Sequence, residues 1–98
     1  MLFLVTWEFV DTSEEGQERS LAVFQNWQPP AEVEFKGFYG FADMSGGCAI
    51  VEAQDAAAIA RTSAPFVAWM SFTVKPILPV EQAAQISGEA LAFVKSIQ

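Results

Sequence analysis

Four stretches of the chain have the residue pattern of β-strands. They are Leu2–Val10, Val33–Ala42, Cys48–Ala53 and Met70–Leu78. Each either alternates apolar and polar residues or is a short apolar run, and each contains β-branched or aromatic residues that favour strands over helices at this length. The sequence therefore predicts a fold with four strands.

The first of these strands is apolar on both of its faces. Successive side chains of a strand point to opposite sides. The two sets are Phe3, Val5, Trp7 and Phe9 on one side, and Leu2, Leu4, Thr6 and Glu8 on the other. One layer of helices in a small α+β domain covers a single side of its sheet, so this strand needs further cover. The pattern predicts a homodimer that forms through the open sheet face.

The first helix is predicted over Ser13–Asn26. Thr12 and Glu15 have the spacing of a capping box, with Thr12 as the N-cap and Glu15 three positions later. The helix is expected to end before Pro29, because the residue that precedes a proline avoids the helical conformation.

Two further helices are predicted in the second half of the chain. Asp55 is a suitable N-cap for a helix that begins at Ala56, and Pro65 should end or kink this helix near Ser63. The last helix is predicted over Pro79–Ile97. Some of its apolar residues fall within an arc of roughly 100°, which is typical of an amphipathic helix. We call this set the apolar stripe: Ala83, Ile86, Ala90, Phe93, Val94 and Ile97.

Glycine and proline mark the irregular points of the predicted strands. Asp43–Gly47 has the composition of a turn, so the second and third strands should form an antiparallel hairpin. Gly37 and Gly40 lie inside a strand pattern, which indicates a bulge or a close approach of another backbone. Pro76 cannot donate a hydrogen bond to a sheet, so the far end of the fourth strand is expected at an edge or a bulge.

The order of the predicted elements indicates the fold. It is β-α-β-β-α-β followed by one extra C-terminal helix. Two split β-α-β units in this order are typical of the ferredoxin-like sandwich, an α+β fold with a four-stranded antiparallel sheet. No repeat or linker interrupts the chain, so residues 1–98 are predicted to form a single domain.

Composition adds constraints on partners and location. Hydrophobic residues make up 52% of the chain and charged residues 17%, so little polar surface covers the apolar residues and self-association is expected. The net charge of −7 makes the chain acidic and disfavours nucleic acids and anionic membranes as partners. Met1–Thr6 has no basic residue before it and Glu8 interrupts the apolar run. It is therefore neither a signal peptide nor a membrane span, and a cytoplasmic location is expected.

The residue types that are missing exclude several kinds of chemistry. The chain has no histidine and one cysteine, Cys48. It therefore lacks a Ser-His or Cys-His nucleophile pair, a His-ligated haem and a His-containing zinc site. A single cysteine forms neither an intrachain disulfide nor a CxxC redox pair. With no acidic calcium loop and no glycine-rich phosphate loop, the sequence predicts no cofactor and no metal.

Three segments resemble an uncharacterised family of short bacterial proteins, a domain of unknown function. They are the opening Met1–Trp7, the Pro-Pro-Ala-Glu-Val segment before the second strand, and Cys48–Asp55, where the third strand meets a helix. That family is similar to the dimeric α/β-barrel superfamily, in which two ferredoxin-like sheets pack face to face. The resemblance implies a homodimer with a small-molecule pocket in each subunit.

Members of this superfamily include haem-degrading and quinone-forming monooxygenases, lactone isomerases and effector-binding domains. The histidine of the haem-binding relatives has no counterpart in this chain. The resemblance implies a small-molecule-binding protein, either a ligand sensor or a cofactor-independent monooxygenase or isomerase that acts on a mainly apolar substrate. The nearer family has no assigned activity and so transfers no catalytic residue. The alternative is a non-catalytic homodimer with a role in protein interaction or structure, which the apolar sheet face favours.

Six residues are candidates for the pocket because they bring a polar or aromatic group to an apolar strand or helix end. They are Thr6, Trp7, Glu8, Tyr39, Glu52 and Trp69. Thr6, Glu8 and Glu52 share one face if the first and third strands are adjacent, and a carboxylate there would serve as a general base. In the competing interpretation, the carboxylates are solvated or paired with Lys36, Lys75 or Arg61, and the aromatic rings pack in the core, the interface or the sheet rim.

Overall fold

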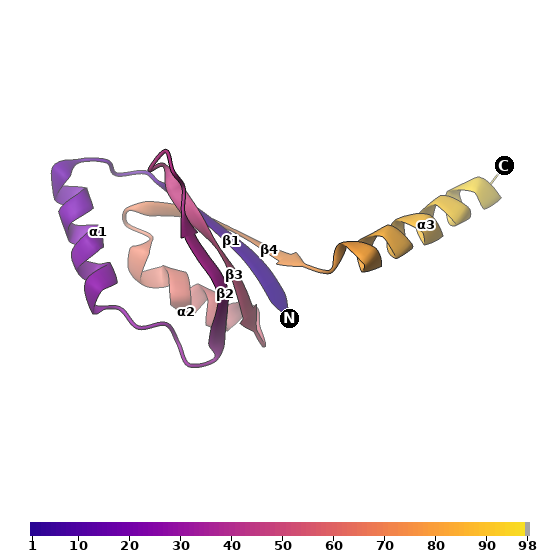
Figure 1. Cartoon of the computed structure of the whole chain (residues 1–98), viewed down its shortest axis with the longest axis horizontal. Coiled ribbons are helices and arrows are strands. Elements are labelled where there is room, and N and C mark those ends of the chain that lie inside the picture. Colours follow the sequence, from indigo (N-terminus) through magenta and orange to yellow (C-terminus); the bar gives the residue numbers. More distant parts are fainter. Residues whose placement is uncertain (98) are drawn as a thin grey trace.

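The computed structural model describes residues 1–97 and contains one antiparallel sheet with helices on one of its faces (Figure 1). The elements, in chain order, are β1 (Leu2–Phe9), α1 (Glu14–Asn26), β2 (Val33–Gly40), β3 (Gly46–Ala53), α2 (Ala56–Ser63), the 3₁₀ turn η1 (Ala64–Phe66), β4 (Met70–Ile77) and α3 (Val80–Ser96). This order confirms the predicted α+β, ferredoxin-like fold with an extra C-terminal helix.

The strands of the sheet lie in the order β2-β3-β1-β4, and every neighbouring pair is antiparallel. β4 is therefore an edge strand, which is where Pro76 is tolerated. The register of β2 against β3 shifts between Phe35 and Gly37. This shift is the bulge that the glycines of β2 predicted, and Lys36 is its extra residue.

The hairpin loop between β2 and β3 lies two residues earlier in the chain than predicted. β2 ends at Gly40 instead of Ala42, and β3 begins at Gly46 instead of Cys48. Gly46 and Gly47 are predicted in the turn, but both are buried in the sheet, where Gly46 pairs with Glu8 of β1. The loop between the two strands therefore spans residues 41–45 instead of 43–47.

The N-cap of α1 is Ser13, so the capping box predicted with Thr12 at the N-cap is wrong. The Ser13 Oγ accepts a hydrogen bond from the backbone N–H of Gly16 at 3.0 Å. The same hydroxyl donates to the Asp11 carboxylate at 2.6 Å, and the backbone N–H of Ser13 donates to it at 3.0 Å. Asp11 thus fixes Ser13 as the N-cap residue, a contribution that a capping-box pattern does not include.

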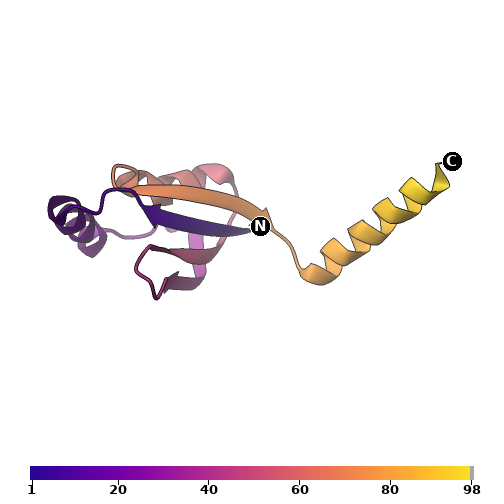
Figure 2. The ribbon, with the colours of Figure 1, turned by 90° about the horizontal axis from the view of Figure 1, so that it is seen from above.

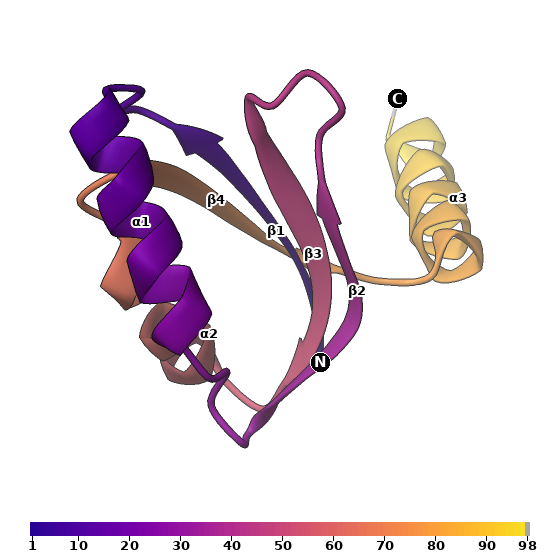
Figure 3. The ribbon, with the colours of Figure 1, turned by 60° about the vertical axis from the view of Figure 1, so that its left-hand side comes forward.

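Both α1 and α2 lie on one side of the sheet, which we call the inner face (Figure 3). Phe3 of β1 and Val51 of β3 point to this side and are 5% and 1% exposed. α2 packs on β2 and β3, with Ala58 and Ile59 buried at the contact, and its N-cap is Asp55, as predicted. No helix of residues 1–97 covers the opposite side, the outer face (Figure 3).

The last helix, α3, stands apart from the rest of the molecule. It follows β4 after Leu78 and Pro79 and projects away from the sheet (Figures 1 and 2). Over Val80–Ser96, as the structure describes them, no residue is buried. Its bounds agree with the predicted Pro79–Ile97 to within one residue at each end. Within residues 1–97, no helix combines the length and apolar character needed to cross a membrane.

Candidate functional site

A cavity of about 800 Å³ lies between the inner face of the sheet and α1. All four strands, α1, α2 and η1 contribute to its walls. The chain has nine phenylalanines and three tryptophans, and nine of these twelve residues line the cavity. They are Trp7, Phe9, Phe24, Trp27, Phe35, Phe38, Phe41, Phe66 and Phe72.

Large aromatic side chains hold α1 away from the sheet and so create this space. Trp27, at the end of α1, has its ring centroid 5.4 Å from that of Phe66 and 6.1 Å from that of Phe35. Phe24, one turn earlier, lies 5.9 Å from Trp27 and 6.1 Å from Phe38. α2 lies against β2 and β3 through Ala58 and Ile59, both of which belong to the core cluster. The sheet is therefore more closely packed under α2 than under α1.

A bulge in β2 places two of the aromatic rings on the same wall. Residues three positions apart in a regular strand point to opposite faces. Because Lys36 is an extra residue, Phe35 and Phe38 both pair with inner-face residues of β3, and their ring centroids are 4.9 Å apart. The bulge thus turns a strand with alternating faces into a wall with adjacent rings.

The indole of Trp7 forms another part of the wall, and Gly47 makes room for it. Trp7 packs edge-to-face against Phe38, with centroids 5.5 Å apart and an interplanar angle of 79°. A Cβ atom on Gly47 would overlap the Trp7 ring and the carbonyl oxygen of Tyr39. Glycine is therefore required at this position for the indole to lie against β3.

Few polar groups face the cavity, and one of them is ionisable. Asp11, at the end nearest the start of α1, is the only Asp or Glu among the lining residues, and none of those residues is Lys or Arg. The side-chain and backbone hydrogen bonds from Ser13 hold the pKa of the Asp11 carboxyl below its ordinary value of 3.8. The hydroxyls of Ser20 and Thr62 already donate to backbone carbonyls of their own helices. Asp11 therefore remains charged at neutral pH.

Of the six residues predicted for the pocket, Trp7 lies on the inner face and lines the cavity. Thr6 and Glu8 point to the outer face, where they border a shallow hollow of about 200 Å³ together with Ser71 and Thr73. Glu8 is exposed, and none of the ion pairs among residues 1–97 involves it. Glu8 therefore fits the competing interpretation, in which the strand carboxylate is solvated.

Glu52 shares the outer face with Glu8, as predicted, but the two carboxylates do not meet. Glu8 pairs with Gly46 at one end of β3, and Glu52 pairs with Leu2 at the other end. Six residues along a strand separate them by roughly 20 Å. The structure therefore corrects the expectation of a joint site formed by Thr6, Glu8 and Glu52.

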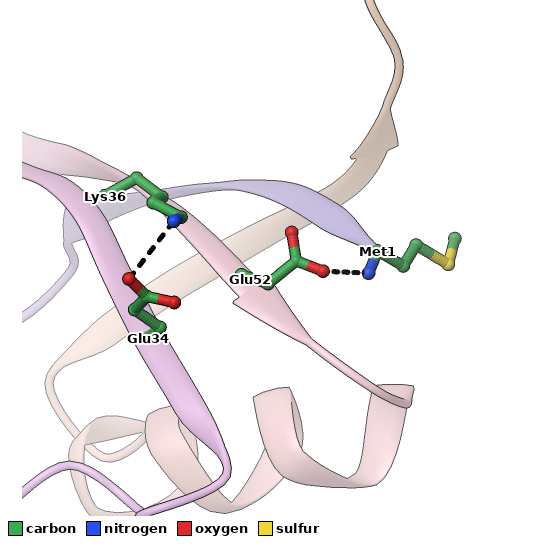
Figure 4. A network of polar contacts seen from close by, with 4 residues as sticks. All are labelled: Met1, Glu34, Lys36 and Glu52. Carbon is green, nitrogen blue, oxygen red and sulfur yellow. Dashed lines mark hydrogen bonds and ion pairs between the residues drawn. The ribbon is translucent and has the colours of Figure 1, made fainter.

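The partner of Glu52 is the N-terminal amine of Met1 (Figure 4). Sequence analysis had considered Lys36, Lys75 and Arg61 as partners for the strand carboxylates. Instead, Lys36 bonds to Glu34 at 3.1 Å, as Figure 4 also shows, and Arg61 lies 3.6 Å from Glu32. The amine and the Glu52 carboxylate are both partly exposed, so this ion pair contributes little to stability.

The other two predicted residues lie apart from these carboxylates. Tyr39 borders the rim of the cavity and is 62% exposed, and its ring lies over Gly37 on the outer face. Trp69 precedes β4 and does not line the cavity; its carbonyl oxygen accepts the backbone N–H of Val10 at 2.9 Å. Trp69 therefore has a structural position between β1 and β4.

Sequence reasoning assigned the remaining wall residues to strands and a helix but not to a site. Phe24 and Trp27 are three positions apart on α1, and Phe35 and Phe38 flank the bulge glycine. Such spacings are equally typical of a packed core, so only the distance of α1 from the sheet identifies them as cavity residues. Within residues 1–97, no cluster of three or more potential metal-ligating side chains is present.

Comparison with protein families places these features in a known group. The family model of DUF3303, a domain of unknown function, matches residues 1–91 of the 98-residue chain. The chain belongs to the DUF3303 family. The predicted resemblance to an uncharacterised family is thereby confirmed, and all of the cavity-lining residues of this DUF3303 chain fall within the matched range. No curated protein matches the chain.

Proposed function

We propose that this DUF3303 protein binds a neutral, planar and mainly apolar small molecule in the cavity between α1 and the sheet. The observation that carries the proposal is the size and lining of that cavity. Its volume of about 800 Å³ falls within the range of small-molecule sites, and such sites are lined by apolar and aromatic side chains with a few polar groups.

The exposed aromatic rings supply the driving force for binding. Phe24 and Phe38 are each 44% exposed, although both take part in the ring cluster. Covering apolar surface contributes roughly 25 cal/mol per Å². Aromatic rings also prefer offset or edge-to-face partners, which a planar ligand provides. A flat aromatic molecule therefore matches the walls in both composition and geometry.

The charge of the cavity selects against anionic ligands. Asp11 is charged and no basic side chain is present among the lining residues. A carboxylate, sulfonate or phosphate group would enter without a counter-charge and close to a negative one, which is costly in an apolar site. A ligand that donates one hydrogen bond to Asp11 is compatible with the same geometry.

Binding is better supported than catalysis. Glu8 and Glu52 are on the outer face, so the sheet separates them from the cavity. Asp11 has a lowered pKa and is a weak base at neutral pH. These positions favour a ligand sensor or carrier over the cofactor-independent monooxygenase or isomerase that the superfamily resemblance also implies.

The outer face supports a homodimer as the working form. Its apolar patch consists of Leu2 and Leu4 of β1, Ile50 of β3 and Ile77 of β4, which are adjacent in register and point away from the helices. Ile50 is 37% exposed and the other three are half-buried. The patch also favours the alternative function, a homodimeric interaction domain, in which the cavity would have no ligand.

Two dyes with the same ring system test the proposed ligand class. N-phenyl-1-naphthylamine is neutral, whereas 8-anilino-1-naphthalenesulfonate carries an added sulfonate; both become fluorescent in an apolar site. Titration of each into the full chain is expected to give at least about tenfold tighter binding of the neutral dye, because the sulfonate lacks a cationic partner. Equal affinities, or tighter binding of the sulfonate, would contradict the proposed ligand class. No binding of either dye would favour the interaction domain.

A further inference from the structure

We infer that α3 is an exchanged arm, whose apolar stripe packs on the outer sheet face of a second copy of this chain. The inference rests on the proposed homodimer and specifies how the dimer is held together. With α3 projecting from the sheet, the molecule is much longer than a compact chain of the same number of residues. The radius of gyration is 17.6 Å and the long axis 60 Å, whereas a compact chain of this length has a radius of gyration of about 13 Å.

α3 has the surface of a packed helix, yet within the described part of the chain none of its side chains is buried. At 100° per residue, Val80, Ala84 and Leu91 extend the apolar stripe to about half of the helix circumference. The side chains concerned are open to solvent: Ile86 is 50% exposed, and Phe93, Val94 and Ile97 are each more than 60% exposed. Most of the stability of helices in proteins comes from packing of an apolar face, so the exposed stripe of this 17-residue helix is expected to gain stability from contact with another surface.

The connection to β4 directs α3 away from its own sheet. Pro79 has φ −55° and ψ 142°, an extended conformation that its ring favours. A proline also biases the residue before it, Leu78, towards an extended conformation. Leu78 and Pro79 alone connect Ile77 to Val80, and the helix leaves the sheet edge without reversing onto it (Figure 2). This geometry favours packing on another molecule over folding back.

The apolar patch of the outer face lies at the end of the sheet from which α3 leaves. Ile77 is the last residue of β4 and pairs with Leu2, next to the position of Leu4 and Ile50. The other end of the same face is polar, with Thr6, Glu8, Ser71 and Thr73. In a two-fold dimer each α3 therefore begins beside the surface that the partner's α3 would cover.

Area favours a second copy over an unrelated partner. α3 is roughly 26 Å long and 10 Å wide, so one helix and the surface it covers bury roughly 500 Å², which is below the size of a specific interface. Two reciprocal helices double this area to roughly 1,000 Å², the threshold for a specific interface. At the apolar end of the outer face the charges are of both signs: Lys75 lies beside Leu4, and Glu52 is paired with the N-terminal amine of Met1.

Two full-length variants with equal added charge test the exchange. Ile86→Glu with Val94→Glu places two carboxylates on the apolar stripe. Gln85→Glu with Ala92→Glu adds the same charge on the polar side of α3. Because α3 makes no buried contact within its chain, both variants should fold. Sedimentation equilibrium is expected to show a rise of at least about 30-fold in the dimer dissociation constant for the first variant, and less than threefold for the second.

The other outcomes separate this inference from the proposed function. If both variants dimerise as tightly as the unmodified chain, the sheet-face dimer stands and the exchanged arm is rejected. If the unmodified chain is a monomer at 100 µM, the dimer and the exchange are both rejected. Affinity for N-phenyl-1-naphthylamine, measured on the same samples, reports on the cavity independently of either result.

Discussion

Replacing Gly46 with alanine is expected to lower the free energy of unfolding by about 3 kcal/mol. Gly46 is buried at the start of β3, opposite Glu8 of β1, and a Cβ atom there would overlap the carbonyl oxygen of Trp7. The neighbour is backbone and cannot rotate away. The overlap can be removed only if β1 and β3 move apart. This movement breaks their hydrogen bonds and displaces Trp7 from the cavity wall.

Gly40→Ala is the matched control for this change. Gly40 ends the opposite strand of the same hairpin, and nothing lies within 4 Å of a Cβ atom built on it. Its backbone is not in the left-handed region, so alanine is tolerated there. Urea unfolding at neutral pH should place Gly40→Ala within about 0.5 kcal/mol of the unmodified chain. Equal stabilities of the two variants would show that β1 and β3 are not paired in this register.

Replacing Trp27 with alanine is expected to weaken binding of N-phenyl-1-naphthylamine by about 100-fold. Trp27 contacts rings of three different elements: Phe24 of α1, Phe38 of β2 and Phe66 of η1. Its removal takes away one wall of the cavity and also the spacer that positions α1. Both losses reduce the apolar surface that the dye covers.

Two further variants test whether the fall in dye affinity is specific to the cavity. Trp69→Ala removes a half-buried tryptophan that does not line the cavity, and it should change the affinity by less than threefold. Trp27→Phe keeps an aromatic ring where α1 meets η1 and β2, and its affinity for the dye should fall by less than tenfold. Retained binding by this variant would show that the loss in Trp27→Ala comes from the missing ring. The dye titration is read from the dye's own emission. Equal losses from Trp27→Ala and Trp69→Ala would place the dye outside the cavity.

The sequence predicted the order and type of every strand and α-helix, though not the 3₁₀ turn η1, because local signals agree with the global fold. Asp55 caps α2, Pro65 ends it, and Gly37 marks the bulge of β2, as expected. The errors arise where two local patterns compete. Thr12 fits a capping box by spacing, but the carboxylate of Asp11 holds Ser13 at the cap. Patterns based on residue spacing do not include such a third partner.

The site was predicted less well than the fold, for a physical reason. Alternation assigns residues to one of two faces, and it correctly separated Trp7 from Glu8 and put Glu8 and Glu52 on the same face. It does not say which of the two faces the helices cover. It does not give the distance along the strand at which two residues lie, so the carboxylates were expected to meet. Nor does it give the separation of helix and sheet, which depends on the packing of Trp27 against η1 and β2.

The excess of apolar residues in the chain now has two separate locations. Part of it forms the aromatic walls under α1, and part lies on the outer face and α3. We propose that a small ligand covers the aromatic walls, and that another copy of the chain covers the outer face and α3. Because the sheet lies between them, substitutions in one should leave the other unchanged, apart from residues such as Gly46 that hold the sheet itself together.

Binding of a planar apolar molecule between α1 and the inner face of the sheet is directly testable with the chain's three tryptophans, since each indole N–H gives one signal in a ¹⁵N–¹H correlation spectrum. Trp7 and Trp27 line the cavity and Trp69 does not. On saturation with N-phenyl-1-naphthylamine, we expect large shifts of the Trp7 and Trp27 signals and a small shift of the Trp69 signal. If Trp69 alone shifts, or if no indole signal moves, the dye is not bound in this cavity and the proposed ligand site is wrong.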